Sequence, residues 1–90
     1  MRSTDYADEL TDPAKVDFPD GGEGRLELLR FKQGTVAGDE GYRFSWWMDG
    51  RIMMRPMDCT EEQFLTLIRD AVTKGIFSAE MKQKIVDILS

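Results

Sequence analysis

The sequence contains no histidine and only one cysteine, Cys59. Histidine is the commonest general base, proton shuttle and metal ligand, so its absence removes the usual catalytic and zinc-binding arrangements. A single cysteine forms neither an internal disulfide nor a multi-cysteine metal site, and it fits a reducing compartment. No apolar run approaches the roughly 18 residues of a membrane span, and Met1 to Leu10 lacks the apolar stretch of a signal peptide. We therefore expect a cytoplasmic protein without metal, cofactor or membrane anchor.

The 90 residues are 41% hydrophobic and 32% charged, which is the composition of one small globular domain. The net charge of −5 is unevenly distributed along the chain. Residues 1–24 hold seven acids and two bases, whereas residues 25–55 sum to +2 and residues 56–90 to −2. Turn-forming residues are also frequent in the first segment. The sequence thus predicts an acidic, largely irregular N-terminal arm over 1–24 and a single small α+β domain over 25–90.

Two segments of the domain have strand character. Residues 25–33 are compatible with either a helix or a strand, because Leu, Glu, Arg and Lys favour a helix while the leucines also alternate. We favour a strand, since the following segment needs a partner for its backbone. Residues 42–48 alternate clearly, and Asp49-Gly50 after them is the strongest short signal for a hairpin turn. A β-hairpin is therefore expected around residues 49–50, with Pro56 ending its second strand.

The C-terminal third has the signals of two helices. Thr60-Glu61-Glu62-Gln63 is a capping box, with Cys59 and Phe64 placed as a hydrophobic staple, so a helix should begin at Glu61. Its expected buried stripe comprises Phe64, Leu65, Leu67, Ile68, Ala71 and Val72. Gly75 should end this helix, and Ser78 should cap a second one with the stripe Met81, Ile85, Ile88 and Leu89. The predicted fold class is α+β: a three-stranded antiparallel β-sheet (a meander) followed by two C-terminal α-helices packed on one sheet face.

The hairpin register suggests a candidate binding surface. It pairs Trp47 with Ile52 and Ser45 with Met54, on the sheet face opposite the one that Trp46 offers to the helices. One helical layer cannot cover two apolar faces. Either the acidic arm covers the second face, through Val16 and Phe18, or that face contacts a protein partner or a second copy. The candidate partner-binding residues are Trp47, Ile52, Met54 and Arg43.

Other chemistry-bearing residues have plainer explanations. Glu61 and Glu62 suit the first turn of a helix, and Asp39-Glu40 suits a loop, so we predict no catalytic residues, no enzyme activity and no small-molecule substrate. The leading hypothesis is a non-enzymatic protein-interaction module, such as a small regulator or inhibitor, that acts through the exposed sheet face or the acidic arm. The alternative is a small nucleic-acid-binding module with a basic, aromatic-bearing sheet, which is disfavoured because no RNA-binding aromatic motif, GXXG loop or basic helix is present.

Overall fold

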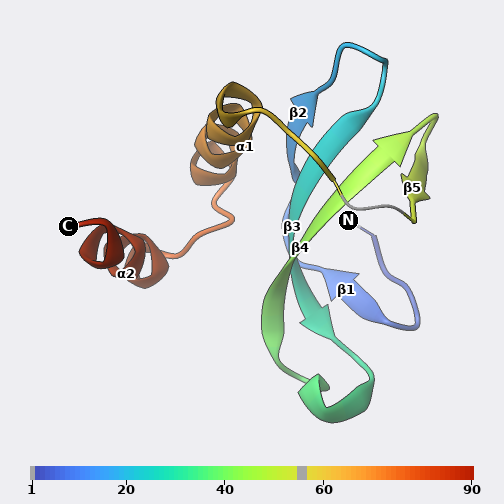
Figure 1. The fold of residues 1–90 in the computed structure, drawn as a ribbon. Coiled ribbons are helices and arrows are strands. Elements are labelled where there is room, and N and C mark those ends of the chain that lie inside the picture. The colour runs from blue at the N-terminus through green and yellow to red at the C-terminus, as the bar shows by residue number, and fades with distance from the viewer. Residues whose placement is uncertain (1, 55–56) are drawn as a thin grey trace.

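The computed structural model describes residues 2–54 and 57–90. It is an α+β fold, as predicted, in which an antiparallel sheet precedes two helices (Figure 1). The elements in chain order are β1 (Ala7–Glu9), β2 (Ala14–Asp17), β3 (Glu23–Phe31), the short 3-10 turn Gly34–Val36, β4 (Glu40–Met48), β5 (Arg51–Met53), α1 (Glu61–Thr73) and α2 (Ala79–Leu89).

The sheet is larger than the predicted three-stranded meander. β3 is central and pairs with β4 along one edge, β5 pairs with β4, and β1 and β2 share the other edge of β3. Residues 1–24, which the sequence analysis treats as a largely irregular arm, supply two short strands of this sheet. These strands have only three and four residues, which is too short for alternation to stand out from a turn-rich sequence.

Residues 25–33, which the sequence left ambiguous, lie mostly within β3. Leu26 faces α1 and Leu29 faces the opposite side, and both are buried. The face of β3 opposite α1 carries the polar residues Arg25 and Glu27 beside Leu29, and Glu27 is buried there, so apolar and polar residues do not simply alternate between a buried and an exposed face. This double burial explains why the segment did not read clearly as a strand.

The hairpin between β4 and β5 has the predicted turn. Asp49 and Gly50 both have positive φ, 51° and 76°, as a type I′ turn requires. The predicted pairs Trp46 with Met53 and Trp47 with Ile52 are confirmed. β5 ends at Met53, so the pairing predicted between Ser45 and Met54 is not formed, and the prediction for Pro56 lies outside the described residues.

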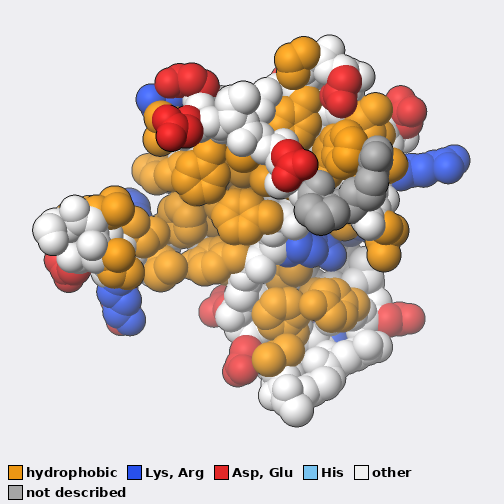
Figure 2. Space-filling view, in the orientation of Figure 1, with side chains coloured by type: hydrophobic (Ala, Val, Ile, Leu, Met, Phe, Trp, Pro, Cys, Tyr) orange, Lys and Arg blue, Asp and Glu red, His pale blue; other side chains and the backbone are white. Residues whose placement is uncertain are grey.

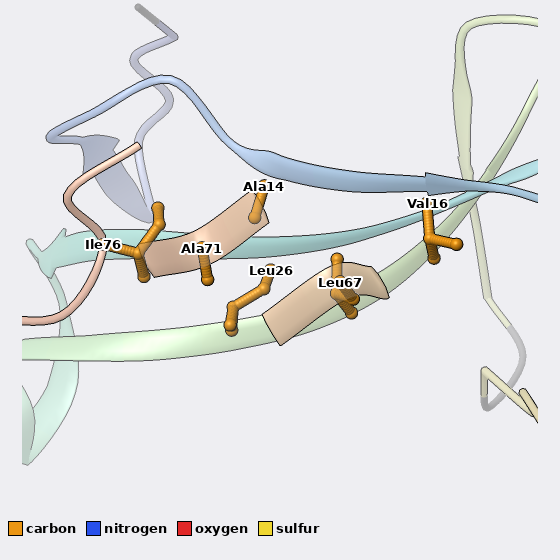
Figure 3. Packing of buried hydrophobic residues seen from close by; sticks show 6 residues of the cluster. All are labelled: Ala14, Val16, Leu26, Leu67, Ala71 and Ile76. Atoms are coloured by element: carbon orange, nitrogen blue, oxygen red, sulfur yellow. The ribbon is translucent and has the colours of Figure 1, made fainter. Parts of the chain in front are cut away.

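The core lies between α1 and the adjoining face of the sheet (Figure 3). Its buried members are Ala14, Val16, Leu26, Leu67, Ala71 and Ile76, contributed by β2, β3, α1 and the segment after α1. α1 begins at Glu61 with the predicted capping box: the Gln63 backbone N–H donates to the Thr60 hydroxyl at 3.1 Å, and the Thr60 N–H donates to the Gln63 side chain at 2.9 Å. These bonds satisfy two backbone donors and fix where the helix enters the core.

A polar contact also ties α1 to β2. The Lys15 backbone N–H donates to the Asp70 carboxylate at 2.8 Å, and Lys74 Nζ lies 3.1 Å from the same side chain. Partial burial acts to raise the pKa of Asp70, but these two donors outweigh it and leave that pKa below its usual value. α1 therefore holds the edge strand by a charged hydrogen bond as well as by packing.

α2 does not pack on the sheet, contrary to the prediction. Ser78 caps it as expected, accepting from the Met81 N–H at 3.0 Å, but none of residues 79–89 is buried. Gly75 has φ 72° and Ile76 is anchored in the core, so the chain turns there and α2 extends away from the sheet (Figure 1). Neither described helix has the length and apolar composition needed to span a bilayer.

Candidate interaction surface

Trp47, the central residue of the predicted binding face, is only 5% exposed. Its indole N–H donates to Ser45 Oγ at 2.8 Å, and the guanidinium carbons of Arg25 and Arg2 lie 4.0 and 4.8 Å from its ring centroid. Such cation–π contacts are favourable and shield the ring from water. Of the two alternatives for this face, the enclosure of Trp47 agrees with cover from within the chain.

The N-terminal segment supplies part of this cover. Arg2 reaches Trp47, and the segment is held in place because Lys32 forms an ion pair with Asp8 at 2.9 Å and donates to the Thr4 carbonyl. The Ser3 hydroxyl and Lys32 lower the pKa of Asp8 by hydrogen bonding to its carboxylate. The arm does cover the second face, but through Arg2 rather than through the predicted Val16, which packs in the core on the α1 side.

Arg43, another predicted binding residue, is bound to a buried carboxylate. Its Nε and Nη2 donate to Glu27 at distances of 2.9 to 3.0 Å, and Ser45 Oγ donates to the same carboxylate at 3.2 Å. Glu27 is 1% exposed. A buried carboxylate requires such partners, so the guanidinium of Arg43 stabilises the fold by pairing with Glu27.

The remaining two predicted residues do not complete a common surface. Ile52 pairs with Trp47 and is partly buried, whereas Met54 lies past the end of β5 and is 93% exposed. The structure thus brings Arg43 and Trp47 together through Ser45, places Ile52 beside Trp47, and leaves Met54 apart.

The exposed apolar side chains gather instead on the two helices. Figure 2 shows hydrophobic side chains extending over α1 and onto α2. The large members that are 44% exposed or more define what we call the helical apolar surface: Phe64, Leu65, Val72, Val86, Ile88 and Leu89. Tyr42 of β4 adjoins it through an edge-on contact with Phe77, with ring centroids 5.6 Å apart. A contiguous exposed apolar area of this kind marks a contact site more often than a solvated surface.

α1 supplies half of the residues of this surface, because its apolar residues extend further around the helix than the contact with the sheet covers. Leu67 and Ala71 face the sheet and are buried. Leu65, Ile68 and Val72 follow one another at spacings of three and four residues, on a face about 110° further around the helix. The sequence-based prediction merged these residues into a single buried stripe. Six of the thirteen residues of α1 are apolar, and this high share is the sign in the sequence that the helix has two apolar faces.

Two hollows interrupt the surface. One, of about 230 Å³, lies between α1 and α2 and is lined by Ile68, Val72, Phe77, Lys82, Ile85 and Val86. The other, of about 380 Å³, lies at the start of α1, where Cys59 and Phe64 border a shallow depression. The predicted staple residues are therefore neighbours, although Phe64 is 44% exposed. Hydrocarbon lining of this kind recognises another apolar surface.

The chain matches no protein-family model, no curated protein and no solved structure. Within residues 2–54 and 57–90, no group of three or more cysteine, aspartate and glutamate side chains is arranged to hold a metal ion.

Proposed function

We propose that the protein is a protein-interaction module that binds its partner through the helical apolar surface. The observation that carries this proposal is α2. It has apolar residues at helical spacing, including Ile85 and Ile88, yet none of its residues is buried. An isolated helix of eleven residues is marginal in water, and most helical stability in proteins comes from burying an apolar face. α2 therefore needs more apolar cover than its own domain provides.

The other surfaces considered from the sequence offer less. Trp47 is enclosed and Arg43 is paired with Glu27, which leaves neither free to stack on or bind a nucleic acid. The acidic arm uses Asp8 to hold Lys32, so part of its charge is neutralised within the fold. The role as a small regulator or inhibitor thus rests on the helices rather than on the sheet face or the arm.

Site-specific photo-crosslinking tests the proposal in the native host. A photoreactive phenylalanine analogue at Ile88 should form covalent adducts with a polypeptide, because this side chain is 81% exposed on the apolar face of α2. Gln83 is the matched control, since it lies on the polar face and donates to Asp87 at 3.0 Å. Adducts from position 88 but not from position 83 are expected. The same analogue at Leu65 probes the α1 part of the surface. Equal adducts from positions 88 and 83 would overturn the proposal, and so would the absence of adducts from both position 88 and position 65.

A further inference from the structure

Apolar residues of α1 and α2 that are exposed or only half-buried form two seams suited to helix–helix packing. On α1 the seam is Leu65, Ile68 and Val72, spaced by three and then four residues. On α2 it is Met81, Ile85 and Ile88, spaced by four and then three. Alternating spacings of three and four place apolar residues along one line of a helix, as in antiparallel bundles.

The two helices of one chain satisfy each other only in part. α2 approaches α1 near its end, where Ile85 and Val86 border the same hollow as Ile68 and Val72. Leu65 at the start of α1 stays 44% exposed, and Ile88 and Leu89 at the end of α2 stay 81% and 80% exposed. The exposed apolar residues thus lie at the start of α1 and at the end of α2.

From this we infer that the partner is a second copy of this chain, with the α1–α2 pairs of the two copies packed around a two-fold axis as a four-helix layer between the sheets. The inference rests on the proposed function and specifies its partner. A two-fold interface needs a surface that is complementary to itself. One chain presents both a helix with an unfilled apolar seam and an apolar hollow beside a second helix, so each copy can supply what the other lacks.

The exposed area agrees with this assignment. At about 150 Å² for each fully exposed residue, the low end of the range for aromatic side chains, the helical apolar surface exposes about 500 Å². A stable interface of standard size buries about 800 Å² on each partner. The surface therefore supplies more than half of such an interface, and the partly exposed Ile68, Phe77 and Ile85 add to it.

Charge opposes the pairing only weakly. The segment 56–90 carries four bases and six acids, a net charge of −2, so two copies repel each other weakly. Lys82 is the charged residue that borders the hollow between the helices, and its exposed side chain can keep its ammonium group at the rim.

Sedimentation equilibrium between about 1 and 200 µM tests the inference, a range that covers typical dissociation constants of small homodimers. The chain should sediment as a dimer in the upper part of this range. Ile88→Glu should weaken association by at least about 30-fold, because it places a charge at an interface anchor. The control Gln83→Glu on the polar face should leave association unchanged. Both variants should keep the helical circular dichroism of the parent, since residues 83 and 88 are exposed.

The arrangement itself is tested by nuclear Overhauser effects between differently labelled copies. Methyl groups of Leu65 and Ile88 should show intermolecular contacts. A chain that is monomeric at the highest concentration, or a dimer whose contacts lie on another face, would overturn the inference. A monomer that still forms adducts with another polypeptide from position 88 would overturn the second copy as partner and leave the interaction module intact, whereas a monomer that forms none would overturn both.

Discussion

The guanidinium group of Arg43 and the carboxylate of Glu27 form an ion pair on the sheet face opposite α1, with Nη2 2.9 Å from Oε1. The side chain of Glu27 is buried, whereas that of Arg43 is 30% exposed. Among the described residues, removing the arginine would leave the buried charge with Ser45 as its one side-chain donor. The two residues therefore have unequal roles: the arginine compensates a cost that the glutamate creates.

Replacing Arg43 by Met should destabilise the fold by about 2 to 4 kcal/mol, because Glu27 loses its ionic partner. The double variant Glu27→Met with Arg43→Met should recover most of this loss, since no unpaired charge remains. Urea denaturation at neutral pH measures both. A double variant no more stable than Arg43→Met would show that the pair contributes more than charge compensation.

Trp47 and Met54, which the sequence grouped in one binding surface, should respond differently to truncation. Trp47→Ala should cost about 3 to 5 kcal/mol, because it empties a buried site and removes both stacked guanidinium contacts. Met54→Ala should change stability by less than about 0.5 kcal/mol, since the side chain is almost fully exposed. Thermal melts followed by circular dichroism would give the comparison. Similar values for the two variants would contradict the burial of Trp47.

Leu65 and Leu67 provide a matched pair on the two faces of α1. Leu67→Ala should cost about 2 to 5 kcal/mol at any protein concentration, because Leu67 is fully buried in the core. Leu65→Ala should cost less than about 1 kcal/mol in dilute solution, where the chain is a monomer. Its effect should grow with concentration if a second copy covers it. A concentration-independent loss of several kcal/mol for Leu65→Ala would show that its face is already part of the monomer core.

Asp70 should make the stability of the fold depend on pH. Its pKa is lower in the folded chain than the ordinary value of 3.8, so it stabilises the fold above that value. This contribution is lost as the pH falls through the lower, folded-state pKa. The difference in unfolding free energy between the parent and Asp70→Asn should therefore be largest near neutral pH and shrink as the pH falls below 3.8. A difference that stays constant over this range would exclude the charged hydrogen bond to Lys15.

Local signals in the sequence predicted the elements that depend on local chemistry. The Thr60 capping box and the Asp49-Gly50 turn are formed by residues within four positions of each other, so their geometry follows from those residues alone. The central strand β3 was harder to predict, because neighbours on both of its faces bury it. β1 and β2 were missed because their pairing depends on β3, which lies further along the chain.

The burial of Trp47, a predicted binding residue, also depends on contacts distant in the sequence. Alternation correctly separated Trp47 from Trp46, but it could not show that Arg2, 45 positions earlier, would lie over the indole. Periodicity alone also could not show which of the apolar residues around α1 face the sheet. Leu67 and Leu65 differ by only two positions, and the contacts with β2 and β3 decide which one is buried.

The contact between α1 and β2 also constrains when the chain can complete its fold. Val16 is translated 60 residues before Ile76, and the core around it includes both Leu67 and Ile76. At about 5 to 20 residues per second, the ribosome needs roughly 3 to 12 seconds to extend the chain from Val16 to Ile76. During that interval β2 has no helical cover. β2 therefore waits for a segment that is synthesised seconds later, and the nascent chain must keep the apolar residues of β2 from other partners until then.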